Sequence, residues 1–127
     1  MDDIIQLRAI GVVRRGEGDG ADRQAVLAVQ PGFRPALLGI EPGMRLQVMY
    51  WMHKLSDEHR RVLQCHPRGD RSRPVRGVFA LRSPMRPNMI GSTEVDVQAV
   101  RETEVVVTGL DAFDGSPIVD IKIAPRR

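Results

Sequence analysis

The stretch TEVDVQAV, residues 93–100, decides the fold class because its polar and apolar residues alternate strictly. Val95, Val97 and Ala99 would share one face of a strand, and the polar residues between them would share the other. A period of two is typical of a β-strand that is buried on one side only. We therefore predict a strand with one face in a core and one in water.

Short β-type segments recur on both sides of this strand, separated by Gly, Pro and Asp. Residues 104–107 should pair with it as a hairpin, since the break at 101–102 is short. Residues 46–52 are apolar on both faces, as in a buried strand. Other strands are expected at 4–13, 25–29, 62–65, 77–81 and 118–123, with short helices at 34–38 and 56–61. This pattern predicts a mainly β protein: a single-domain β-barrel or coiled antiparallel sheet with one or two short helices.

The composition is that of one globular domain, residues 1–127. Hydrophobic residues make up 42% and aromatic residues only 4%, so the core must consist of Val, Ile, Leu and Ala. Cys65 is the sole cysteine, which excludes an internal disulfide and suits a reducing compartment. The opening MDDIIQLR has no long apolar run, so we expect neither a signal peptide nor a membrane anchor. These features predict a soluble cytoplasmic protein.

Positive charge is concentrated in one part of the chain. The whole chain carries a net charge of +3, but residues 59–86 contain eight arginines against one acid, Asp70, a local net charge of +7. Arginine makes forked contacts with phosphate and stacks on flat rings. This segment is therefore a candidate surface for RNA, and the alternative is a solvated face in an Arg-biased sequence.

Known catalytic and metal-binding patterns are missing. The residues His53, His59, Cys65 and His66 fit no compact zinc spacing, so we predict no metal site. The stretch GEGDG, residues 16–20, lacks the Lys-Ser/Thr of a phosphate loop, and we interpret residues 14–22 as a polar connector.

Two segments carry unusual restraint or buried charge. Pro84 and Pro87 stiffen the stretch RGVFALRSPMRPNMIG, residues 76–91, from which several polar side chains project. In GLDAFDGSPIVDIK, residues 109–122, Asp111 and Asp120 each adjoin apolar residues, where a carboxylate needs a partner. Either segment could be purely structural, a rigid crossover or a turn, so the residues alone leave the question open.

These two segments resemble the motifs of the TsaA-like (TrmO-type) family. Its patterns run approximately G-V-F-A-T-R-S-P-x-R-P-N-P-I-G and L-D-x-x-D-G-T-P-V-x-D-I-K-P-Y. The stretches IGVVR from Ile10, VQPGF around Pro31 and VMYWMH ending at His53 are similar to further family segments, so the resemblance covers nearly the whole chain.

The resemblance implies a β-barrel methyltransferase that uses S-adenosylmethionine. The family's characterised activity is N6-methylation of N6-threonylcarbamoyladenosine beside the anticodon of a threonine tRNA, by homodimers whose cofactor lies in a cleft near the subunit interface. It implies cofactor-binding roles for Gln30, Pro31, Gly32, Phe33, His53, Lys54, Arg82, Ser92, Thr108, Gly109, Leu110 and Asp111. Asp111 and Asp120 are the candidate catalytic proton acceptors, and the residues expected to contact tRNA are Arg68, Arg71, Arg73, Arg76 and Arg86.

The sequence departs from the family pattern at positions that bear on the substrate. Met89 replaces a proline, which should loosen the loop, and Ile123 and Ala124 replace a Pro-Tyr pair. The acceptor could therefore be another RNA or a small molecule. A module that binds S-adenosylmethionine or RNA without turnover is the third possibility.

Overall fold

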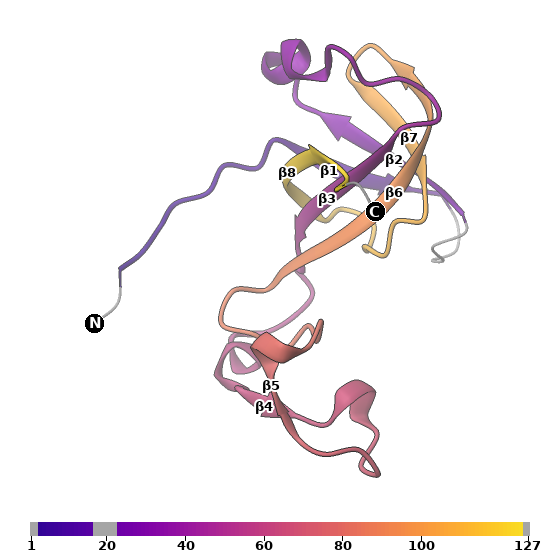
Figure 1. Cartoon of the computed structure of the whole chain (residues 1–127). Helices are drawn as coiled ribbons and strands as arrows, with labels where there is room; N and C mark the ends of the chain where they lie inside the picture. The colour runs from indigo at the N-terminus through magenta and orange to yellow at the C-terminus, as the bar shows by residue number, and fades with distance from the viewer. Residues whose placement is uncertain (1–2, 17–22, 126–127) are drawn as a thin grey trace.

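Six antiparallel strands close into a barrel in a computed structural model that describes residues 3–16 and 23–125. Their order around the barrel is β1-β2-β7-β6-β3-β8 (Figure 1). The strands are β1 (Gly11–Arg15), β2 (Gln24–Val29), β3 (Arg45–Trp51), β6 (Ile90–Arg101), β7 (Glu104–Thr108) and β8 (Pro117–Ile123). The predicted mainly β barrel is thus confirmed. Of the predicted connector 14–22, residues 17–22 lie outside the described residues, and the prediction is wrong at Arg14 and Arg15, which belong to β1.

The core fills the barrel with aliphatic side chains, because alternate residues of each strand point inward. Val48 on β3, Val95 on β6 and Val105 on β7 are completely buried. The burial of β3 alternates along its length, so its second face is half-exposed rather than buried as predicted. A barrel of this kind needs few aromatic residues, in line with the composition.

The hairpin predicted between residues 93–100 and 104–107 is present as β6 and β7. Its register shifts between Val97 and Ala99 at a β-bulge. A bulge inserts one residue and so reverses the alternation beyond it. Consequently Val100, opposite the buried Val105, packs on the core, and Ala99 does not continue the inward face as predicted.

The first strand is shorter than predicted. It begins at Gly11. Ile10 still hydrogen-bonds to Ile118 and Gln30, whereas residues 3–8 run away from the barrel without strand pairing (Figure 1). Ile4 and Ile5 are 88% and 82% exposed, so their apolar character did not indicate burial. Glycine is required at position 11 for a steric reason: a Cβ there would lie 2.4 Å from the carbonyl oxygen of Ala28 on the paired strand.

The short helices are 3-10 turns whose bounds differ from the prediction. The first, η1 (Pro31–Leu37), starts three residues earlier than expected. The second, η2 (Asp57–Arg61), follows Ser56, whose side chain and that of His59 cap each other's backbone N–H groups. Such reciprocal capping satisfies donors that a helix start leaves unpaired.

Between β3 and β6 the chain leaves the barrel in a long segment, residues 52–89, which we call the excursion (Figure 1). It contains a two-stranded ribbon of β4 (Gln64–Cys65) and β5 (Arg76–Gly77) and the turns η3 (Pro67–Gly69) and η4 (Val78–Ala80). The strand predicted over residues 77–81 is wrong, because Val78 is buried and the chain turns there. The buried residues of the excursion are Pro67, Val78 and Met89.

Candidate functional site

One end of the barrel and the excursion together enclose a cleft of about 1360 Å³. Strands β3 and β6 are antiparallel, and Trp51 pairs with Ile90, so the excursion leaves and rejoins the barrel at this same end. The segment 110–116, between β7 and β8, forms part of the cleft lining. The two segments singled out in the sequence therefore meet at one site.

Arg15, at the end of β1, fixes the segment between β7 and β8. Its Nε donates to the carbonyl oxygen of Ala112 at 2.6 Å, and its Nη2 donates to the carbonyl of Leu110. Its backbone N–H donates to Oδ1 of Asp114 at 2.8 Å. No local sequence pattern singles out Arg15, since its partners lie more than 90 residues away along the chain.

Tyr50 joins both sides at the base of the cleft. Its hydroxyl lies 3.0 Å from Oγ1 of Thr93 and donates to the carbonyl of Asp111. Burial is the main cause that raises the pKa of Tyr50 above its ordinary value. The ring occupies the space beside Gly91, where a Cβ would lie 2.4 Å from the Cε2 atom of Tyr50. The glycine of the Ile-Gly step is thus required by Tyr50.

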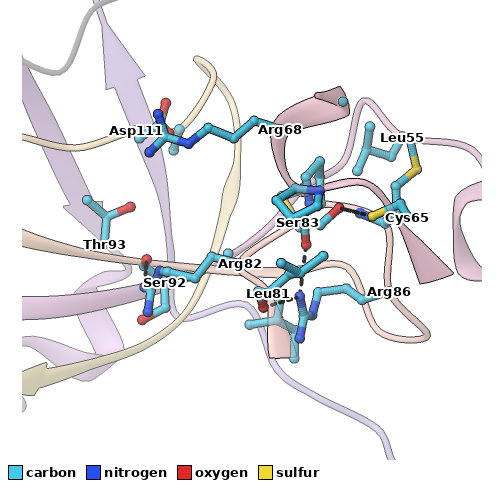
Figure 2. Close-up of a pocket in the computed structure, with 18 of the residues that line it drawn as sticks. Leu55, Cys65, Arg68, Leu81, Arg82, Ser83, Arg86, Ser92, Thr93 and Asp111 are labelled. Atoms are coloured by element: carbon cyan, nitrogen blue, oxygen red, sulfur yellow. Dashed lines mark hydrogen bonds between the residues drawn. The ribbon is translucent and has the colours of Figure 1, made fainter. Parts of the chain in front are cut away.

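Hydrogen bonds from its own side chains shape the proline-stiffened stretch on the excursion. Arg82 donates from Nη2 to the carbonyl of Ser92 at 2.9 Å, which connects the excursion to β6 (Figure 2). Arg86 donates to the carbonyl of Ser83 at 2.8 Å, and the Oγ of Ser83 accepts the backbone N–H of Met85 at 3.1 Å. Met89, expected to loosen this loop, is instead 3% exposed and packed.

A second loop of the excursion presents Arg68 to the cleft. His66 Nδ1 lies 2.8 Å from the carbonyl oxygen of Arg73 and so ties the two ends of this loop together. Arg68 has a φ of 53°, a conformation that costs energy in residues other than glycine. In Figure 2 its side chain extends toward Asp111 on the barrel side.

The cleft is strongly positive. Its lining contains Arg15, Lys54, Arg68, Arg71, Arg73, Arg76, Arg82 and Arg86. Among the described lining residues, Asp111 is the only carboxylate. Low-dielectric walls lined by one sign of charge attract counter-charged ligands and concentrate them. The site is therefore suited to a ligand that carries several negative charges.

The lining also contains an aromatic ring with a cation on its face. The Nζ of Lys54 lies 4.6 Å from the ring centroid of Phe113, a cation–π contact. Cys65 lines the same cleft, and its Sγ lies 3.8 Å from Oγ of Ser83. Among the described residues no three potential metal ligands cluster together.

The structure gathers some of the predicted site residues and separates others. Those on the cleft are Lys54, Arg82, Ser92, Leu110 and Asp111, together with Arg68, Arg71, Arg73, Arg76 and Arg86. Thr108, Gly109 and His53 do not line it. His53 nevertheless lies close to the segment between β7 and β8, because a Cβ at Gly115 would be 3.8 Å from its Nε2 atom.

The segment from Gln30 to Phe33 lies at the other end of the barrel. It follows β2, whose last residue Val29 donates to the carbonyl of Thr103, beyond the far end of β6. Asp120 also lies away from the cleft, on β8, where it forms an ion pair of 3.1 Å with Lys122. The cofactor roles implied for Gln30, Pro31, Gly32 and Phe33 stay predictions.

The chain is thus a β-barrel protein with an arginine-lined cleft at one end. The tRNA-methyltransferase O N-terminal domain family matches residues 13–124, and the chain belongs to this family. The resemblance noted in the sequence is thereby confirmed.

Relatives of similar length are named as binding proteins. A probable S-adenosyl-L-methionine-binding protein of Methanocaldococcus jannaschii is 40% identical over 92% of this chain and 90% of its own length. One of Pyrococcus horikoshii, with the same description, is 34% identical over 93% and 81%. A tRNA (adenine(37)-N6)-methyltransferase of Mus musculus is 33% identical over 68% of this chain but only 20% of its own length.

Solved structures of TrmO share the fold. The crystal structure of TrmO from Pseudomonas aeruginosa superposes with a TM-score of 0.71 at 24% identity. The match covers 97% of this chain, which spans 57% of the TrmO chain.

No helix among the described residues is long and apolar enough to cross a membrane.

Proposed function

We propose that the cleft binds S-adenosylmethionine and that the protein is a methyltransferase acting on RNA. The observation that carries this proposal is the convergence of two segments, residues 80–93 and 110–116, on one cleft. These segments bear the family motifs. Family membership and the names of the relatives support the choice of cofactor.

The residues present fit this cofactor. The cleft volume of about 1360 Å³ exceeds the about 300–1,000 Å³ typical of small-molecule sites, which leaves room for a second ligand. Arg82 gives one N–H to Ser92 and carries further donors that suit the carboxylate of an amino acid. Asp111 offers acceptors for ribose hydroxyls or an amino group.

Methyl transfer requires mainly positioning and exclusion of water. When bound, S-adenosylmethionine would supply a methyl group, carried on a positively charged sulfur, for transfer to an exocyclic nitrogen that gives up a proton. Asp111 is the favoured acceptor for that proton because its exposed carboxylate lines the cleft. Asp120 is the weaker candidate, since Lys122 and the N–H of Ile121 already engage it.

The specific substrate that we propose is the threonylcarbamoyladenosine beside the anticodon of threonine tRNA, which would be methylated at N6. The positive lining of the cleft supports an RNA substrate, since Arg68, Arg71 and Arg73 can neutralise several phosphates. The name of the mouse relative points to an adenosine of tRNA. A homodimer, a cytoplasmic location and a single domain over residues 1–127 belong to the same proposal.

The second candidate is a protein that binds S-adenosylmethionine but methylates a different RNA or a small molecule, or does not turn over. The relatives that this chain matches over most of their length are named for cofactor binding alone. The chain also spans little more than half of the solved TrmO chain. Ile123, where the family pattern has proline, is 63% exposed and does not line the cleft.

Mass spectrometry of tRNA nucleosides from a deletion strain distinguishes these functions. The proposal predicts that the methylated threonylcarbamoyladenosine disappears and returns when the wild-type chain is restored. Restoration with an Asp111→Asn variant should return less of it. Unchanged nucleosides in the deletion strain would favour the second candidate.

A further inference from the structure

Among the described residues of the cleft lining, one phenyl ring is exposed. Phe113 is 47% exposed and lies on the lining, between the two aspartates of the segment that joins β7 to β8. The other aromatic residue of the described lining, Tyr50, is 5% exposed, and its hydroxyl is bonded to Thr93 and Asp111. A ligand that enters the cleft therefore meets the ring of Phe113.

The backbone holds Phe113 in place. Its carbonyl oxygen accepts the N–H of Ser116 at 3.1 Å and the hydroxyl of Ser116 at 2.7 Å. Ser116 is 1% exposed, so this double contact is buried. Arg15 binds both neighbours, through the carbonyl of Ala112 and the carboxylate of Asp114. These contacts fix the backbone that carries the ring, so little backbone entropy is lost when a ligand packs on Phe113.

The electrostatic environment of the ring suits a flat, nitrogen-containing heterocycle. Lys54 places its ammonium 4.6 Å from the centroid of Phe113, at the negative face of the ring. A base that stacks on this face would move the ammonium to its edge, where the three N–H groups can donate to ring nitrogens. Aromatic side chains stack with nucleobases in many single-stranded RNA sites.

We propose that Phe113 and Lys54 form a subsite for a purine ring, with Phe113 at its face and Lys54 at its edge. The inference deepens the proposed function and rests on it, because both the cofactor and the acceptor contain adenine. The family motif quoted above leaves residue 113 unspecified. The chemistry is shared by two sources, the adenine of the cofactor and the target adenosine, and the experiment has one arm for each.

The first arm measures the affinity of the full chain for S-adenosylhomocysteine by calorimetry. The second measures its affinity for an unmodified anticodon stem-loop RNA. In the arm that contains the stacked base, Phe113→Leu should weaken binding about 5- to 100-fold, the scale of one base–aromatic stack. Phe113→Trp should retain binding, and Lys54→Met should give a smaller loss. Phe79→Leu is the matched control, because Phe79 is 82% exposed and does not line the cleft.

The outcomes separate the subsite from the function. A loss confined to S-adenosylhomocysteine assigns the cofactor's adenine to the ring, and a loss confined to the RNA assigns the acceptor base. Equal affinities of wild type and Phe113→Leu in both arms would overturn the subsite while leaving the proposed function standing. Failure of the wild type to bind either ligand would instead overturn the proposed function together with the subsite. An unchanged thermal midpoint of Phe113→Leu shows that the variant is folded.

Discussion

The barrel and the excursion differ in what holds them together. The barrel buries aliphatic side chains on six paired strands, and its core residues such as Leu27 and Val107 are inaccessible to water. The excursion is shaped by prolines and by hydrogen bonds from polar side chains to backbone, such as those of Arg86 and His66. Packing therefore stabilises the barrel. In the excursion, polar contacts that bury little surface hold the charged side chains in position.

The largest expected difference between the two regions is their response to truncation of leucine. Leu27→Ala should reduce the free energy of unfolding by about 2–5 kcal/mol, because a completely buried side chain leaves a cavity. Leu63→Ala, on the excursion, should change it by less than about 0.5 kcal/mol, because Leu63 is 58% exposed. Urea titration of both variants measures this. Comparable losses would show that the excursion is packed as tightly as the barrel.

A substitution at the junction of the two regions should come next in size. Gly91→Ala places a methyl group 2.4 Å from the Tyr50 ring and should destabilise the protein by about 1–3 kcal/mol through overpacking. Gly32→Ala serves as the control, since a Cβ at Gly32 meets nothing within 4 Å. Thermal unfolding followed by circular dichroism compares them, and equal midpoints would mean that Tyr50 does not occupy this space.

The charge of the excursion can be tested apart from its stability. Replacing Arg71 and Arg73 together by alanine should reduce the slope of log affinity against log salt, for a tRNA ligand, by about one to two charges. Arg34→Ala with Arg101→Ala removes the same charge from positions that do not line the cleft. The contrast fails if both pairs alter the slope equally, and the arginines would then act only through net charge.

The smallest expected effect is alkaline destabilisation through Tyr50. The folded protein raises the pKa of Tyr50 above 10.0, so the folded state binds this proton more tightly than the unfolded chain does. This contribution to stability is complete below pH 10.0 and is lost as the pH rises through the folded-state pKa. Tyr50 is the only tyrosine, so tyrosinate absorbance reports its titration directly. In Tyr50→Phe the stability curve should be flatter above pH 10.0, and an equally steep curve would assign the loss to other groups.

Sequence patterns predicted the barrel better than the excursion for a physical reason. Strict alternation, as in residues 93–97, reports directly which side chains are buried. The pattern fails where burial stops following a period of two, as at the bulge after Val97 and at the turn that buries Val78. The exposed Ile4 and Ile5 show the converse, apolar residues without a partner strand.

For the site, the motifs identified the two segments that form the cleft but not the residues that connect them. Arg15 and Tyr50 join segments distant in sequence, and their roles depend on barrel closure. A contact over such a distance leaves no local pattern. The segment at Gln30 was identified by motif alone, and the fold of one chain does not bring it to the cleft.

Calorimetry of wild type and Arg82→Ala with S-adenosylhomocysteine tests whether the cleft holds the cofactor. Arg82 projects into the cleft from the excursion, and Arg34 provides a control on η1 outside the lining. We predict that wild type and Arg34→Ala bind alike and that Arg82→Ala binds about 1–3 kcal/mol more weakly, the scale of a charge-assisted hydrogen bond. Cofactor binding in this cleft is contradicted if wild type does not bind, or if Arg82→Ala binds as tightly as wild type.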